Sequence, residues 1–253
     1  MQTFQQRHKY RMKELVDKLQ GHTHYLLGFF CELLERYAYL EPMLFQEEVA
    51  KSFNSAKKGR GFDVILYSLF FECIQDVAKI SMDKDKKTPS IENIMEGLSC
   101  KCARNMLREQ FTKAKLNNSE DADESVRELC KRIKNKNKTE RHKIFDNTYK
   151  SLVNQWDIFK TNQQIRTFCT IRDKLTAHLE LKKVNGSYNF IDISKLNLKW
   201  GDLGKALSEL QPIVRDLNLI IKNESFDFEY TESSFKKNGR LFWGKDTTKE
   251  WRE

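Results

Sequence analysis

The chain has 253 residues, 39% hydrophobic and 32% charged, so it is long enough to bury a hydrophobic core. Its 10 glycines and 3 prolines are too few for a collagen-like or turn-rich all-β protein, and abundant Lys, Glu and Leu favour helices. The formal net charge of +9 favours a polyanionic partner, nucleic acid ahead of an anionic membrane surface. A generally lysine-rich set of cellular proteins would produce the same charge without such a partner.

The cysteines and the N-terminus indicate where the protein works. Only Cys100 and Cys102 lie close together, and no second pair or histidine cluster completes a zinc site, so we expect no metal and no cofactor. The N-terminus lacks the apolar segment of a signal peptide, and no apolar run reaches the roughly 18 residues that span a bilayer. We therefore predict a soluble, reduced, cytoplasmic protein without contact to a membrane.

The first part of the chain reads as three helices. Apolar residues recur at helical spacing through residues 4–41, which predicts one long helix or two in line, and Pro42 is expected to end this part. A second helix is predicted over about 43–56, and the glycines in the segment 57–61 are expected to break it. The third, over 62–82, is apolar on nearly all sides, which predicts burial in a bundle or at a subunit interface.

The middle of the chain is more polar. After a charged connector, Ser90 is placed to cap a short helix over 91–98, and a further helix is predicted over 101–116. Another begins near Glu124, and helical periodicity returns over 144–162.

The segment 130–143 carries the strongest charge run of the sequence, seven Lys or Arg residues against one Glu. Such a run suits a phosphate backbone, because each contact releases counterions. A flexible, solvated loop between two helices is the alternative. The run has no interleaved aromatic residues and so implies no base stacking. The candidate RNA-binding residues are Lys131, Arg132, Lys134, Lys136, Lys138, Arg141 and Lys143.

The last third holds a helix over 163–181 and then a change of pattern. Asn185-Gly186 between two alternating runs is typical of a β-hairpin with a two-residue turn. Asp202 is predicted to cap a helix that reaches about residue 223 and is kinked or restarted near Pro212. The tail, residues 225–253, mixes aromatic and charged residues and is expected to cover the bundle or a partner.

Arg172, Asp173 and His178 lie within two helical turns of the 163–181 segment. Histidine moves protons near neutral pH, and the guanidinium group of arginine is a charged fork that fits phosphate oxygens. A carboxylate next to the arginine can orient either group. The three residue types suit RNA cleavage without a metal, in which the 2′-hydroxyl attacks the neighbouring phosphate and arginine stabilises the charged transition state.

A single regular helix does not bring these groups to one phosphate. Six residues at about 100° each place Arg172 and His178 about 120° apart around the helix and roughly 9 Å apart along it. The same helix from the second subunit of a symmetric dimer would complete the cleft. Alternatively the group is structural, with an arginine paired to an acid and a histidine satisfied by its neighbours.

The sequence from Arg172 to His178 resembles the motif of the HEPN superfamily: an arginine, a polar residue, a few more residues and a histidine. Five residues separate the two here, within the four to six that the superfamily accepts. The order of elements over about residues 30–225 is similar to the AbiU-like abortive-infection branch. HEPN toxins controlled by nucleotidyltransferase partners often have a tyrosine two residues after the histidine, where this chain has Glu180, so we do not expect control through that position.

The resemblance implies an all-α HEPN-like bundle with a small β-hairpin insertion, frequent homodimers and, in many members, metal-independent endoribonuclease activity in antiphage or toxin systems. Carried over to this chain, Arg172 and His178 are catalytic and Asp173 supports them. We expect one domain over 1–253, with N-terminal helices to about 60, a core over about 62–224 and the tail.

These features together predict a cytoplasmic abortive-infection effector that cleaves RNA and leaves 2′,3′-cyclic phosphates. Its expected partners are RNA, a second copy of the chain and an inhibitor or activator protein. A non-catalytic RNA-binding or protein-interaction module of a defence system is the alternative. A metal-dependent nuclease is a third interpretation, and the sequence has no clustered carboxylate motif to support it.

Overall fold

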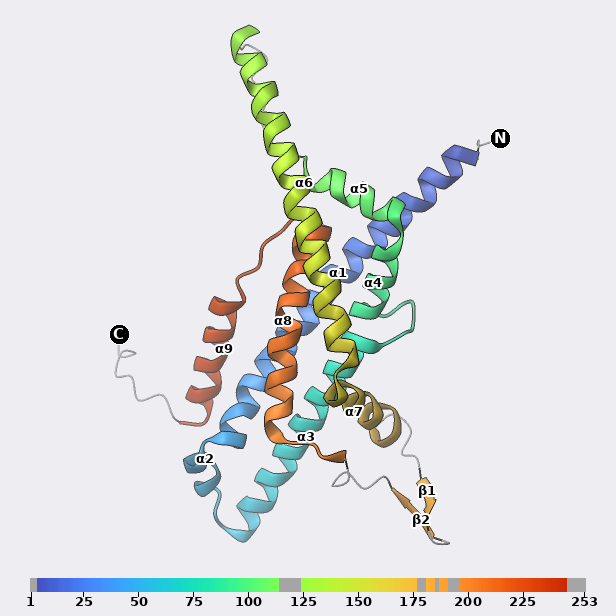
Figure 1. The fold of residues 1–253 in the computed structure, drawn as a ribbon. Helices are drawn as coiled ribbons and strands as arrows, with labels where there is room; N and C mark the ends of the chain where they lie inside the picture. The colour runs from blue at the N-terminus through green and yellow to red at the C-terminus, as the bar shows by residue number, and fades with distance from the viewer. Residues whose placement is uncertain (1–3, 114–123, 177–180, 185–186, 191–195, 245–253) are drawn as a thin grey trace, which may run out of the picture. The chain divides into compact units, whose positions relative to one another are not determined.

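Helices make up nearly all of the described chain. The computed structural model describes residues 4–113, 124–176, 181–184, 187–190 and 196–244. The helices are α1 (Phe4–Phe45), α2 (Glu47–Lys51), α3 (Ala56–Met82), α4 (Ile91–Ser99), α5 (Lys101–Phe111), α6 (Glu124–Thr161), α7 (Gln163–Ile171), the π-helical turn η1 (Arg172–Thr176), α8 (Trp200–Lys222) and α9 (Phe228–Phe242) (Figure 1). The helical fold class predicted from the sequence is confirmed.

Two short strands follow the motif region in the chain. Strand β1 (Leu181–Val184) pairs with β2 (Ser187–Phe190) in antiparallel register, with Leu181 opposite Phe190 and Val184 opposite Ser187. The predicted turn residues Asn185 and Gly186 lie outside the described residues.

The chain groups into two compact units. The first unit contains residues 1–26, 84–157 and 212–226, and the second contains 27–83, 158–211 and 227–253. Helices α1, α6 and α8 contribute residues to both units. The single domain expected from the sequence stays a prediction.

Each unit has a core of apolar side chains at helical spacing. In the first unit, α4 and α5 place one apolar face each in the core, with Ile91, Ile94, Leu98, Ala103, Leu107 and Phe111 buried. In the second unit, α3 packs against α7 and also contacts η1 (Figure 1). The buried residues of α3 and α7 there include Phe70, Cys73, Ile74, Val77, Ile165, Phe168 and Ile171. The motif region is therefore fixed on α3.

Pro42 does not end the first helix, contrary to the prediction. Helix α1 continues to Phe45, and the N–H of Gln46 donates to the carbonyl of Pro42 at 3.0 Å. Proline removes the hydrogen bond that its own N–H would donate, so the residues after it can still complete helical bonds. The single helix predicted over 43–56 is also wrong, because α1 ends at Phe45, α2 covers only Glu47–Lys51, and α3 begins at Ala56.

The glycines of the segment 57–61 do not interrupt the helix, contrary to the prediction, because both lie inside α3. Helix α3 begins at Ala56, since the side chain of Ser55 accepts a hydrogen bond from the N–H of Lys58 at 3.4 Å. Each glycine costs the helix about 1 kcal/mol, which the burial of the apolar residues that follow offsets. The predicted helix over 62–82 is confirmed within α3.

The basic run and the tail are both helical. Residues 124–161 form the single helix α6, so the alternative of a flexible loop for the segment 130–143 is wrong. Within the tail, α9 covers Phe228–Phe242, and Asp227 caps it by accepting a hydrogen bond from the N–H of Tyr230 at 3.0 Å. The carboxylate of Asp202 accepts from the N–H of Lys199 at 2.9 Å, so Asp202 caps α8 from inside its first turn.

Candidate functional site

The chain leaves regular α-helical geometry at the first residue of the motif. Helix α7 begins at the cap Asn162, whose side chain accepts from the N–H of Gln164 at 3.0 Å, and it ends at Ile171. The π-helical turn η1 then covers Arg172–Thr176. Turns of this kind are rare and frequently mark functional sites. The angle and rise calculated above assume a regular helix, and that assumption is wrong for this chain. His178 lies outside the described residues.

The guanidinium group of Arg172 is held at two points. Its Nε donates to Oδ1 of Asp173 at 2.7 Å, and its Nη1 donates to the carbonyl oxygen of Ala78 on α3 at 3.1 Å. The side chain of Arg172 is only 19% exposed, whereas Asp173 is exposed. The structure thus brings two of the three predicted catalytic residues together and fixes the arginine against α3.

Nearby charges keep Arg172 protonated. Burial lowers the pKa of the guanidinium, but the hydrogen bond to Asp173 and the negative charges of Asp173 and Asp83 outweigh this effect and raise the pKa above its usual value. Burial also raises the pKa of the neighbouring thiol of Cys169, although the charge of Arg172 opposes this. Arg172 is therefore a permanent cation, as stabilisation of a charged transition state requires.

Sequence reasoning missed the contribution of α3 to this site. The carbonyl of Ala78 binds Arg172 directly, and Asp83 acts on it through its charge. A backbone acceptor leaves no trace in residue type. The apolar α3 and the apolar face of α7 could have indicated that the two helices pack together, but not which turn of α3 meets Arg172.

The basic run divides into paired and exposed side chains. Lys138 forms an ion pair with Glu109 at 2.8 Å, and Arg141 donates to the carbonyl of Phe111 at 2.7 Å and to Asn223 at 2.6 Å. Lys136 and Lys143 are exposed. Lys131, Arg132 and Lys134 belong to α6, but their side chains lie outside the described part of the chain. Lys138 and Arg141 thus have structural partners of their own.

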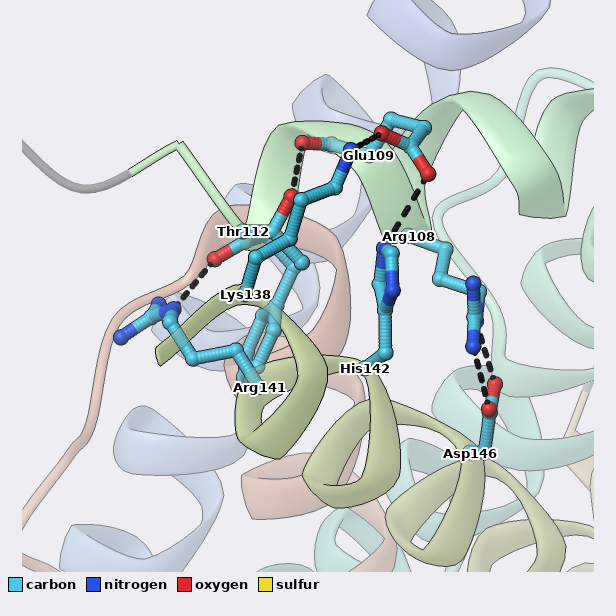
Figure 2. Close-up of polar contacts among 8 residues, drawn as sticks. Arg108, Glu109, Thr112, Lys138, Arg141, His142 and Asp146 are labelled. Atoms are coloured by element: carbon cyan, nitrogen blue, oxygen red, sulfur yellow. Dashed lines mark hydrogen bonds and ion pairs between the residues drawn. The ribbon is translucent and has the colours of Figure 1, made fainter. Parts of the chain in front are cut away.

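Figure 2 shows that these contacts join α5 to α6 within the first unit. Arg108 donates to both carboxylate oxygens of Asp146, each at 2.7 Å, and Nε2 of His142 lies 3.1 Å from Oε1 of Glu109. The hydrogen bond from Arg108 lowers the pKa of Asp146, and the hydrogen bond from Lys138 lowers the pKa of Glu109. Part of the basic run therefore attaches α6 to α5.

Asp146→Asn tests how much the ion pair between Arg108 of α5 and Asp146 of α6 contributes to stability. Because its folded-state pKa is depressed, Asp146 stabilises the fold above its ordinary pKa of 3.8, and this contribution is lost as the pH falls through the lowered value. We expect the variant to lose about 0.5–1 kcal/mol at pH 7 and nothing at a pH below the lowered pKa. Urea unfolding at both pH values measures the difference. Asp17→Asn, at an exposed position of the same unit, is the control, and an equal loss there would contradict the assignment.

The described residues hold neither a metal-binding cluster nor a membrane span. No three or more His, Cys, Asp or Glu side chains are grouped to hold a metal ion among the residues that the structure describes. Over the same residues, none of the helices has an apolar stretch long enough to cross a membrane.

A family model matches nearly the whole chain. The AbiU2 model of the HEPN group matches residues 16–242, a range that includes Arg172, Asp173 and His178. The chain belongs to the AbiU2 family of HEPN proteins. The match confirms the predicted resemblance and extends it beyond residues 30–225, so that it also includes all of α9 in this AbiU2 protein. No curated protein and no solved structure matches the chain.

Proposed function

We propose that this AbiU2-family protein is a metal-independent endoribonuclease that acts as an abortive-infection effector. The observation that carries the proposal is the arginine of the motif, fixed by Asp173 and α3 on a π-helical turn. A catalytic group of this kind must be held in place before the substrate arrives, because a group that reorganises during the reaction stabilises the transition state less. Membership of the family supports an antiphage setting.

The proposed reaction is a transesterification at one phosphate of the RNA. The 2′-oxygen loses its proton to a general base, for which His178 is the candidate, and bonds to phosphorus while the bond to the 5′-oxygen breaks. A general acid returns a proton to the leaving 5′-oxygen, and Arg172 neutralises the charge on the non-bridging oxygens. The products carry a 2′,3′-cyclic phosphate and a 5′-hydroxyl group.

A homodimer is the proposed active form. One motif has one histidine, whereas the reaction needs both a base and an acid, and two copies of the motif in a symmetric cleft provide both. The basic residues of α6, above all the exposed Lys136 and Lys143, are proposed to contact RNA phosphates. A cognate inhibitor or activator protein would control such an enzyme in the cell.

Cleavage in EDTA by the purified full-length protein tests the proposal. We expect wild type to cleave tRNA, rRNA or mRNA without a metal and to leave 2′,3′-cyclic phosphate ends, and we expect His178→Ala to leave these RNAs intact. If a folded wild-type dimer cleaves none of the three RNA classes, this result contradicts the proposed endoribonuclease activity. Equal cleavage by wild type and by His178→Ala would contradict the proposed role of the motif.

One observation favours the alternative of a non-catalytic RNA-binding or interaction module. Asp173 and the carbonyl of Ala78 already occupy two donor positions of Arg172, as in a purely structural arginine. In that case the protein would bind RNA in EDTA without cutting it, and changes at Arg172 would alter stability in place of activity.

A further inference from the structure

An aromatic pocket lies in the second unit between α3 and the start of α8. It has a volume of about 330 Å³ and is lined by Tyr67, Phe70, Phe71 and the segment 197–200. This volume is at the lower end of the range for sites that hold small organic groups. The pocket shares no residue with the group around Arg172.

Two of its rings combine exposure with rigid support. Tyr67 is 49% exposed and Trp200 is 38% exposed, with their ring centroids 5.8 Å apart. The ring of Trp200 also packs edge-on against the buried Phe70, with centroids 4.6 Å apart. A flat ligand would find here two aromatic surfaces that are already held in place.

The rim of the pocket adds polar chemistry. Lys199 is exposed and forms no ion pair with another described residue, and its backbone N–H is fixed by Asp202. Asn197 is also exposed, and its φ of 50° places it in a tight turn next to the pocket. The pocket thus joins aromatic surfaces to a cation and to an amide that can donate and accept hydrogen bonds.

The pocket is aligned with Arg172 along α3. Tyr67 and Ala78 are eleven residues apart, which is about three helical turns, so they lie on the same face of α3 and roughly 16 Å apart. The carbonyl of Ala78 binds Arg172. The distance between the pocket and the Arg172 contact on α3 is therefore about the length of a few nucleotides.

We propose that this pocket binds a base of single-stranded RNA, which stacks on Tyr67 and Trp200 while Lys199 contacts the adjoining phosphate. Stacking on aromatic side chains and contact with basic ones is the usual way in which proteins hold unpaired bases. The inference rests on the RNA partner of the proposed function and not on the cleavage step.

Binding of a probe that cannot be cleaved tests the pocket in the full-length protein. A fluorescein-labelled ten-nucleotide 2′-O-methyl oligoadenylate lacks the attacking hydroxyl, and an abasic strand of equal length keeps the phosphates without the bases. We expect Tyr67→Leu and Trp200→Leu each to weaken binding of the oligoadenylate about 5- to 150-fold and to leave the abasic strand unaffected. Tyr230→Leu, at a tyrosine of the same unit that is 76% exposed, should change neither.

Lys199→Gln provides a second test if Trp200→Leu fails to fold, because the side chain of Lys199 is exposed and is not one of the packed rings. Lys199→Gln removes one cation from the rim and should lower the slope of log affinity against log salt concentration by about one. Equal binding of the two probes by wild type, or full affinity in Tyr67→Leu, would overturn the proposal. Loss of self-association in Tyr67→Leu with RNA affinity intact would also overturn it, and would assign the pocket to a second copy. If the protein binds RNA through its bases but does not cleave natural RNA, this result supports the pocket and contradicts the proposed endoribonuclease activity.

Discussion

Arg172→Ala should lower the rate of RNA cleavage about 10²–10³-fold, the usual cost of removing one group that stabilises a charged transition state. The guanidinium is the cation that the structure fixes in the motif, held by Asp173 and by α3. The matched control is Arg166→Ala, on the exposed side of α7 and six residues earlier in the chain. It removes the same charge from the same unit and should leave the rate nearly unchanged. The measurement is the initial rate of cleavage in EDTA.

Arg172→Lys separates charge from geometry. Lysine keeps the positive charge but lacks the planar fork, so it cannot reach Asp173, the carbonyl of Ala78 and a phosphate together. We therefore expect it to recover only part of the lost rate. Thermal unfolding of the same variants distinguishes the structural alternative: if Arg172→Ala unfolds at a much lower temperature and Arg172→Lys restores both stability and the full rate, the arginine acts by holding α3 and η1 together.

Local signals in the sequence predicted the helices that such signals control. Ser90 accepts a hydrogen bond from the N–H of Asn93 at 3.2 Å, and α4 begins directly after it, as predicted. The helix predicted over 101–116 is present as the shorter α5. Caps and apolar spacing act within a few residues, so they can be recognised without knowledge of the fold.

The helix in the tail was missed because distant packing decides it. In the tail, Asp227 is a recognisable N-cap, but the helix that follows it was hidden by aromatic residues that resemble surface contacts. Phe228 packs edge-on against Phe30 of α1, with ring centroids 5.5 Å apart, and Nε1 of Trp243 donates to the carbonyl of Tyr39 at 2.9 Å. These partners are about two hundred residues away in the chain, which no local pattern records.

The candidate site was predicted to a similar extent. Arg172 and its pairing with Asp173 follow from neighbouring residues and are present. The π-helical turn and the carbonyl of Ala78 depend on how α3 packs against α7, so spacing alone could not give them. The aromatic pocket joins Tyr67 to Trp200 across more than half the chain and was missed for the same reason.

Gly239 of α9 is the second position at which a single substitution should have a large effect. A methyl group added at its Cα would collide with the carbonyl oxygen of Ala38 in α1, a backbone atom that cannot rotate away. Pro42 lies four residues after Ala38 and has no N–H to donate to that carbonyl. The close approach of α9 thus uses the one turn of α1 where proline has removed the helical hydrogen bond.

Gly239→Ala should therefore destabilise the protein by about 1–3 kcal/mol, the range for an overpacked interior. Taken alone, the change favours a helix by about 1 kcal/mol, so a net loss means that the clash outweighs the gain. The control is Gly21→Ala in the middle of α1, where nothing lies within 4 Å of the added methyl group and stability should rise. Urea unfolding measures both variants, and equal gains in the two would mean that α9 does not dock on α1. Opposite signs for one substitution in two helices would locate the contact at Ala38, because helix propensity acts equally at both.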